Sequence, residues 1–239
     1  MTSERYIRQI PLFGSDGQEK LLDSCVLVAG AGGLGSPAAT YLALAGVGEI
    51  IIADADVVDE TNLNRQFLHA TSNIGLMKVY SAASTLKALN PDISISACPE
   101  SITSGTINGL VRDADIIVDA VDNYETRYVL NQAAIEHQIP LVHGAVEGFS
   151  GQMTTIIPGK TPCLACIIPE SPPKRITPII GATAGVIGSL QAMEVIKCIT
   201  GTGTLLSGRL MIWDGSSGRT DYITLKQRSD CAVCTQEGT

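Results

Sequence analysis

The sequence predicts an α/β fold in which a parallel sheet fills the first half of the chain and antiparallel strands follow. Short apolar runs that suit buried strands alternate with helical patterns up to residue 148, and this alternation is typical of a parallel sheet. Beyond that point, residues 151–159 and 209–227 have the pattern of strands that follow one another without a helix after each. The 239 residues, of which 45% are hydrophobic, can bury the core of one domain.

The expected elements of the first half follow in a regular order. Residues 25–29 form a strand that meets a glycine turn, and residues 36–45 form a helix with Pro37 in its first turn. Further strands are expected at 49–56, 93–97, 115–123 and 141–148, and further helices at 75–91 and 124–140. In the second half, a helix is expected at 184–201, between the two strand segments.

The composition excludes several classes of protein. A formal charge of −8 and a pI near 4.8 argue against a nucleic-acid-binding protein, which normally carries a basic face. Charges throughout the first 25 residues leave no apolar segment for a signal peptide, and no run of 18 apolar residues suits a membrane span. We therefore expect a cytoplasmic protein that does not enter a membrane and whose seven cysteines stay reduced.

A glycine motif follows the first strand. Gly30, Gly32 and Gly35 match GxGxxG between a strand and a helix, a Rossmann-like arrangement in which a phosphate approaches backbone N–H groups at the helix N-terminus. Asp54 lies at the end of the second strand, where such folds bind a ribose hydroxyl, and Asp56 is either a ligand contact or a turn acid. Taken alone, the motif suggests NAD, or a tight packing turn without a ligand.

Two cations beyond the motif favour ATP over NAD. Arg65 lies in "NLNRQF" shortly after the second strand, and Lys78 begins the next helix. The glycine turn already serves the pyrophosphate of NAD, whereas a triphosphate offers further charge to one guanidinium and one ammonium. Either cation alone would suit a solvated surface charge, so the prediction rests on the two together.

The strand at 115–123 carries the predicted magnesium ligand. Mg²⁺ is usually bound by one or two carboxylates plus phosphates, and Asp122 lies at the edge of the sheet where ligands of α/β folds bind. Asn123 either shares that ligand or caps the following helix. Asp119 is interpreted as structural. The three histidines have no evident partners and are interpreted as core or surface residues: His69, His137 and His143.

Two C-x-x-C pairs predict a metal site in the second half. Thiolates in two such pairs suit a tetrahedral, structural Zn²⁺ site, although either pair alone would also suit a redox dithiol. The predicted ligands are Cys163, Cys166, Cys231 and Cys234. The other three cysteines are interpreted as core or surface residues away from the carboxyl ends of the parallel strands: Cys25, Cys98 and Cys198.

Several segments together resemble the HesA/MoeB/ThiF group of ubiquitin-activating-type adenylyltransferases. They cover nearly the whole chain in the family's order: "RYIRQ", "GAGGLGSP", "DADVVDETNLNRQ", "GLMKVYSA", "DAVDNYETR", "PCLAC", "GVIGSLQAMEVIK" and "CAVC". Such proteins use ATP to adenylate the C-terminal glycine of a small ubiquitin-like sulfur carrier ending in Gly-Gly and release pyrophosphate. The resemblance implies this reaction here, within molybdopterin, thiamine or related sulfur-transfer biosynthesis.

The resemblance also implies roles for particular residues. By position, contacts to ATP or its metal fall on Gly32, Asp54, Asn62, Arg65, Lys78 and Asp122, with Asn123 nearby. It implies a homodimer in which Arg8 reaches the partner's ATP site. The expected layout is one domain with a helical segment at 1–24, a nucleotide-binding core at 25–157 and a zinc-bearing part at 158–239. A crossover loop at about 167–180 carries Lys174 and Arg175.

One departure from the family pattern bears on the chemistry. In sulfur-transferring relatives of the ThiF kind, the loop after the first zinc pair carries a cysteine that bonds to the carrier, and residues 167–187 contain none. We therefore expect a MoeB-like role limited to adenylation. With no rhodanese domain after Cys234, a separate sulfurtransferase or cysteine desulfurase is expected to supply sulfur. The alternatives are an NAD-dependent oxidoreductase and a non-catalytic binder of a ubiquitin-like protein.

Overall fold

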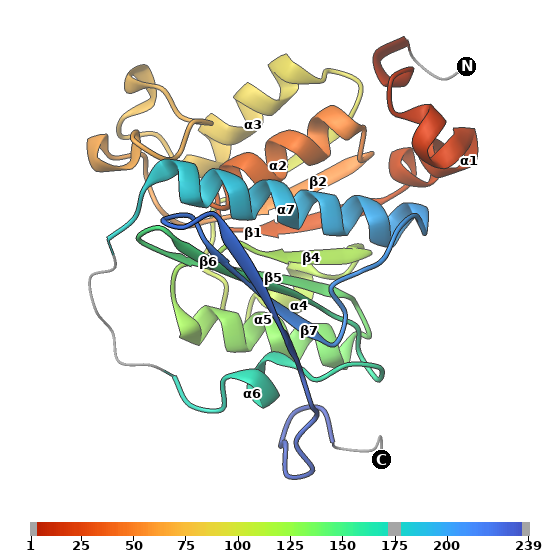
Figure 1. Cartoon of the computed structure of the whole chain (residues 1–239). Helices are drawn as coiled ribbons and strands as arrows, with labels where there is room; N and C mark the ends of the chain where they lie inside the picture. The colour runs from red at the N-terminus through yellow and green to blue at the C-terminus, as the bar shows by residue number, and fades with distance from the viewer. Residues whose placement is uncertain (1–3, 172–177, 236–239) are drawn as a thin grey trace.

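A computed structural model describes residues 4–171 and 178–235. Within these ranges the chain forms one sheet of eight strands in the order β3-β2-β1-β4-β5-β6-β7-β8, with helices on both faces (Figure 1). Pairing is parallel from β3 to β5 and antiparallel from β5 to β8. The predicted α/β fold with a mixed sheet is therefore confirmed.

The parallel part contains five strands: β1 (Cys25–Ala29), β2 (Glu49–Ala53), β3 (Ser94–Cys98), β4 (Ile116–Asp119) and β5 (Leu141–Glu147). All residues of β1 are buried. Its continuous apolar sequence follows from its position, because a parallel strand covered by helices on both faces loses the alternation of polar and apolar residues. β1 pairs with β2 on one side and β4 on the other, which makes its carboxyl end the switch point of the sheet.

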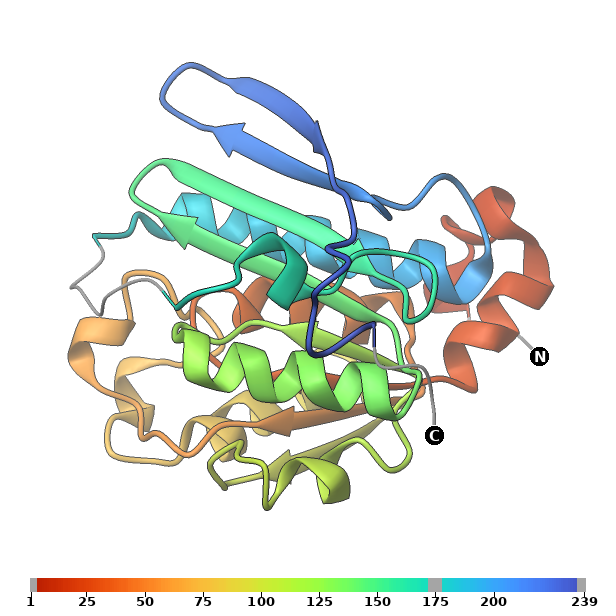
Figure 2. The ribbon, with the colours of Figure 1, turned by 90° about the horizontal axis from the view of Figure 1, so that it is seen from below.

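The antiparallel part contains three more strands: β6 (Ser150–Ile156), β7 (Arg209–Asp214) and β8 (Arg219–Thr224). β5 and β6 form a hairpin that turns at Gly148, whose φ is +56°. β8 is exposed at all six positions, and the β7–β8 hairpin forms the outer edge of the sheet in Figure 2. The polar sequence of β8 matches this edge position.

Helices build a separate core on each face of the sheet (Figure 1). One face carries α1 (Ile10–Leu22), α2 (Gly35–Ala45), α3 (Lys78–Leu89) and α7 (Gly181–Thr200). The other carries α4 (Ile107–Leu110), α5 (Tyr124–Glu136) and α6 (Leu164–Ile167). Short 3-10 helices occur at Glu4–Tyr6, Glu60–Asn62 and Thr71–Asn73.

Helix α7 is, among the described residues, the one helix long and apolar enough to cross a membrane by length and composition. Its position explains its apolar sequence. It packs against α2, α1 and β5, and buried residues recur along its length from Thr183 to Thr200. It has the pattern of a core helix.

The observed elements differ from the predicted ones in a few places. β2 ends at Ala53, where its pairing with β1 stops, and the Asp54 carboxylate then binds the backbone N–H groups of Ala31 and Asp56. β4 ends at Asp119. Helices α4 and α6 were not predicted, because four residues carry too little periodicity to be recognised. Lys174 and Arg175 of the crossover loop lie outside the described residues.

The predicted location of Cys98 is wrong. Cys98 is the last residue of the parallel strand β3, and its carbonyl accepts a hydrogen bond from the N–H of Asp54. It therefore lies at the carboxyl edge of the sheet, which the sequence analysis had excluded. The cause is the length of β3, which continues one residue beyond the apolar pattern.

The turn between β1 and α2 is packed so closely that one added methyl group should destabilise the fold. A Cβ at Gly35 would lie 1.9 Å from the carbonyl oxygen of Gly30. We expect Gly35→Ala to lower the free energy of unfolding by about 1–3 kcal/mol or more, measured by urea denaturation. As a matched control, Gly185→Ala adds a methyl group inside α7 where no atom lies within 4 Å, and it should leave stability unchanged or raise it by about 0.5–1 kcal/mol. Equal midpoints for the two variants would contradict this account.

Candidate functional site

A cavity of about 540 Å³ lies at the carboxyl edge of the parallel strands. Ligands of open α/β folds bind at this edge, beside the switch point. The cavity is lined by the glycine turn, the ends of β2 and β4, the residues after β3 and the start of α3. Seven predicted site residues line it: Gly30, Gly32, Asp54, Arg65, Lys78, Asp122 and Asn123. Three others do not: Arg8, Gly35 and Asn62.

In the glycine turn, the backbone of Gly30 lies against the backbone of the segment that follows β4. Gly30 has a φ of +101°, and a Cβ there would lie 2.7 Å from the carbonyl oxygen of Ala120 beyond β4. Gly35 begins α2, whose N-terminus has no side-chain cap. The first N–H groups of a helix point toward its N-terminal end and carry partial positive charge. The turn can therefore offer backbone donors to an anion in the cavity.

Asp54 and His69 hold this turn from two sides. Asp54 accepts a hydrogen bond from the N–H of Ala31 at 2.8 Å. His69 is buried between the carbonyl of Ala31 and the hydroxyl of Ser81, each 3.0 Å from a ring nitrogen. Burial lowers the pKa of His69. Of the two alternatives for His69, core or surface, the structure shows the core one, and the two hydrogen bonds of the ring tie the turn to α3.

The two predicted cations reach the cavity from different elements. Lys78 is the first residue of α3 and is only 6% exposed. Its Nζ lies 2.7 Å from Asp56 Oδ2 in an ion pair, so Asp56 is both a cavity residue and the partner of this cation. Arg65 is half-buried, and its Nη1 donates to the carbonyl of Thr61 and to Asn64 Oδ1 at 2.9 Å.

Asn62 stands in a different setting. Its Oδ1 accepts a hydrogen bond from the N–H of Asp59 at 3.1 Å, as part of a capping box that closes the 3-10 helix Glu60–Asn62. In this conformation Asn62 shapes the segment that carries Arg65. Its predicted contact with the nucleotide stays a prediction.

Asp122 and Asn123 follow β4 at the opposite side of the cavity. Asp122 is exposed, and its carboxylate is available to a cation. Asn123 caps α5, because its Oδ1 accepts a hydrogen bond from the N–H of Thr126 at 2.9 Å. The capping alternative for Asn123 is therefore present in the structure. Whether it also shares the ligand stays a prediction.

Beneath the loop that carries Asp122 and Asn123 lies a buried network of charged side chains and hydrogen bonds, which was not predicted from the sequence. His143 Nδ1 lies 2.6 Å from Asp119 Oδ2, and both side chains are fully buried. Arg127 lies 3.6 Å from the same carboxylate and donates to the carbonyls of Val121 at 2.7 Å and Gly144 at 2.8 Å. Burial lowers the pKa of His143. Asp119 is structural, as predicted, and Arg127 holds the backbone next to Asp122.

The spacing of "DAVDNYETR" contained a signal for Arg127. It lies one helical turn after Asn123, which directs it back under the N-terminus of α5. The partners Asp119 and His143 come from neighbouring strands 24 residues apart in the sequence, so only the sheet brings them together.

Arg8 lies outside the cavity and is exposed between the first 3-10 helix and α1. Large apolar side chains next to Arg8 in the chain and on three helices of one sheet face are also exposed: Ile7 at 63%, Leu12 at 72%, Tyr41 at 52% and Tyr80 at 55%. Such exposed apolar side chains before α1 and on α1, α2 and α3 suit an interface more than a solvated surface.

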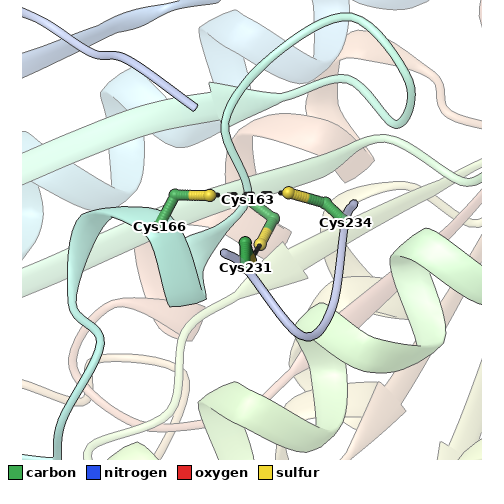
Figure 3. Close-up of side chains that lie close together, drawn as sticks. All are labelled: Cys163, Cys166, Cys231 and Cys234. Atoms are coloured by element: carbon green, nitrogen blue, oxygen red, sulfur yellow. Dashed lines mark hydrogen bonds between the residues drawn. The ribbon is translucent and has the colours of Figure 1, made fainter. Parts of the chain in front are cut away.

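The four predicted zinc ligands converge on one point (Figure 3). Their sulfur atoms all lie within 4.8 Å of one another, with Cys163 and Cys231 at 3.6 Å and Cys166 and Cys234 at 3.4 Å. Zinc–sulfur bonds of 2.3 Å in a tetrahedron place the sulfurs about 3.8 Å apart. The arrangement fits a closed four-thiolate Zn²⁺ site.

The three remaining thiols are held in the protonated form. Burial raises the pKa of Cys25 to about 12. Burial also raises the pKa of Cys98 and of Cys198. Because the thiolate is the reactive form, none of these cysteines has the environment of an activated nucleophile.

Comparisons with known proteins agree with this geometry. The chain matches the ThiF family over residues 5–233. It is 40% identical to the SAMP-activating enzyme E1 of Haloferax volcanii, an alignment that covers 98% of this chain and 90% of that protein.

Two further relatives extend the comparison. The chain is 45% identical to the adenylyltransferase and sulfurtransferase MOCS3 of Aedes aegypti over 97% of this chain and 55% of that protein, so it spans about half the length of this relative. A crystal structure of Escherichia coli MccB with ATP is similar with a TM-score of 0.87 and 25% identity, covering 98% of this chain and 74% of that chain. From the matched residues and the shared fold, the chain belongs to the ThiF family.

Proposed function

We propose that this protein uses ATP to adenylate the C-terminal glycine of a small ubiquitin-like sulfur carrier. The observation that carries the proposal is the meeting of Arg65, Lys78 and Asp122 around one cavity at the glycine turn. An adenylyltransferase must bind a triphosphate and its metal. The two cations and the uncapped N-terminus of α2 suit the phosphates, and the carboxylate suits Mg²⁺. The names of the relatives, an activating enzyme and an adenylyltransferase, support the same reaction.

The reaction is a displacement at the α-phosphorus. The carrier's C-terminal carboxylate would attack, forming a carboxyl–phosphate bond while the bond to the β-phosphate breaks and pyrophosphate leaves. Arg65 and Lys78 would neutralise charge on the phosphate oxygens, and Asp122 would hold Mg²⁺, which supplies further charge stabilisation when bound. The carrier supplies the nucleophile, so the protein acts by positioning and electrostatics.

Lys78 needs a change of partner for this role. In the free protein its ammonium is paired with Asp56, whose side chain is 71% exposed. A triphosphate carries more charge than one exposed carboxylate, so it would draw the ammonium into the cavity. Asp56 therefore holds the Lys78 side chain at the edge of the cavity until the nucleotide arrives.

The proposal includes partners and ions that follow from the family. The carrier would end in Gly-Gly, a separate sulfurtransferase or cysteine desulfurase would act next, and Zn²⁺ would stabilise the C-terminal half. The product would be used in molybdopterin, thiamine or related sulfur-transfer biosynthesis. The protein would be a cytoplasmic homodimer, with the exposed apolar set around Ile7 and Tyr80 as part of its interface.

The first prediction concerns the reaction. ATP–pyrophosphate exchange should appear only when a carrier with a free Gly-Gly terminus is added, and Asp122→Ala should slow it by about 10²–10³ through lost charge stabilisation. Glu136→Ala, an exposed acid at the far end of α5, is the matched control and should not change the rate. Equal exchange without a carrier would remove this function. Oxidation of NADH in place of exchange would also remove it and would favour a dehydrogenase.

A second prediction concerns the metal. Protein purified without chelators should contain one zinc per chain, and Cys163→Ser with Cys231→Ser should abolish it. Structural zinc supplies on the order of 10–16 kcal/mol in zinc peptides, against about 5–15 kcal/mol for a whole domain, so chelation should lower the melting temperature. Cys198→Ser should keep its zinc. Metal analysis that finds no zinc in the unaltered protein would contradict the predicted zinc site.

The third prediction tests whether Arg8 serves the partner's site. Inactive Arg8→Ala mixed with inactive Asp122→Ala should regain activity after subunit exchange, because each mixed dimer holds one complete site. A mixture of Arg65→Ala and Asp122→Ala is the control, since every site then lacks one of its own residues. No recovery in the first mixture would place Arg8 in its own chain or outside the mechanism.

A further inference from the structure

Gln66 carries an unsatisfied polar group at the wall of the cavity. The residue is 4% exposed and lines the cavity directly after Arg65. Its Oε1 is buried without a hydrogen-bond partner. A buried polar atom without a partner costs free energy, and native structures contain few of them. The folded protein therefore tolerates an unfavourable side chain at this position.

The location of this group distinguishes it from similar ones. Among the described residues, five buried side-chain atoms lack a partner: Ser36 Oγ, Thr40 Oγ1, Gln66 Oε1, Asn131 Nδ2 and Gln191 Oε1. Of these five residues, Gln66 alone lines the cavity. The missing partner can therefore arrive with a ligand.

The Gln66 amide lies directly over the glycine turn. A Cβ added at Gly32 would meet Gln66 Nε2 at 3.5 Å, and within 4 Å it would meet no atom from another residue. The backbone of Gln66 is held on both sides, since its N–H donates to the carbonyl of Asn62 and its own carbonyl accepts from the N–H of His69, each at 3.0 Å. The fold thus presents the carboxamide at the place where the turn offers backbone donors.

We propose that Gln66 is a nucleotide-contacting residue that binds the hydrated phosphates. Its Nε2 donates to a phosphate oxygen, and a rotation of the carboxamide on binding brings its buried Oε1 within reach of a water that enters with the phosphate group. Phosphate is favoured over base or ribose because the amide lies over Gly32 of the glycine turn, and the side chain of Arg65, which also lines the cavity, lies against Gly33 of the same turn. This inference rests on the proposed ATP-dependent function and adds a residue to it.

The test relies on one substitution that should raise the stability of the protein and weaken its binding of nucleotide. Gln66→Leu keeps the size of the side chain and removes the unsatisfied atom, so the melting temperature of the nucleotide-free protein should rise by about 2–4 °C. The same change should weaken the binding of ATP and ADP by about 10- to 100-fold, measured by calorimetry with Mg²⁺, and leave adenosine unchanged. A purely structural role would lower the melting temperature instead.

Gln191→Leu provides the matched control. Gln191 also has an unsatisfied Oε1, but its Nε2 donates to the carbonyls of Asp119 at 2.8 Å and Val142 at 3.1 Å. The change should lower the melting temperature, because it removes two made hydrogen bonds. Gln66→Glu keeps the shape of the side chain and places a carboxylate against the phosphates. It should therefore weaken ATP binding at least as much as Gln66→Leu, and it replaces the leucine variant in the test if that variant does not fold.

The outcomes separate this inference from the proposed function. ATP bound equally well by the unaltered protein and both Gln66 variants would overturn the inference and leave the function intact. An equal loss for adenosine would overturn the assignment to phosphate. An unaltered protein that binds no ATP would overturn both the inference and the function.

Discussion

The close approach of the β1–α2 turn to the end of β4 is the contact on which the site depends. Gly30 and Gly35 leave no room for a methyl group between the turn, its own backbone and the carbonyl of Ala120. This packing brings the N-terminus of α2 to the switch point of the sheet, where β2 and β4 diverge on either side of β1. Asp54 and His69 then hold the turn by hydrogen bonds to Ala31. Without this close contact between the turn and the end of β4, the backbone N–H groups of the turn and the carboxylate of Asp122 would not face one cavity.

Charges of both signs surround this contact, because four acids also line the cavity: Asp54, Asp56, Glu100 and Asp122. The chain carries a formal charge of −8, yet Arg65, Lys78 and Arg127 gather at the cavity. Each is held by local acceptors: Lys78 by Asp56, Arg65 by Thr61 and Asn64, and Arg127 by carbonyls and Asp119. These contacts restrict long side chains at the cavity wall before a ligand binds, and such restriction lowers the entropic cost of binding.

The second half of the chain is tied to the same cavity. Residues after the undescribed segment return to the β5–β6 turn, where Gly148 N–H donates to the carbonyl of Pro178 at 2.7 Å and Thr183 Oγ1 donates to the carbonyl of Gly148 at 2.9 Å. Gly181 at the start of α7 then packs on the backbone of Asn64 and Arg65. The segment from the zinc cluster to α7 therefore ends against the backbone of Asn64 and Arg65 at the wall of the cavity.

The sequence by itself determined the order of strands and helices, the parallel-to-antiparallel change, the glycine turn and the four converging cysteines, because local periodicity, turn residues and ligand spacing encode them. It also placed Lys78 and Asp122 near one edge. Only the tertiary structure decided that Lys78 pairs with Asp56, that Cys98 ends β3 at the site, and that Asp119, His143 and Arg127 form one network. These features arise from pairing between strands and packing between elements far apart in the chain, and no local pattern records which side chains such pairing brings together.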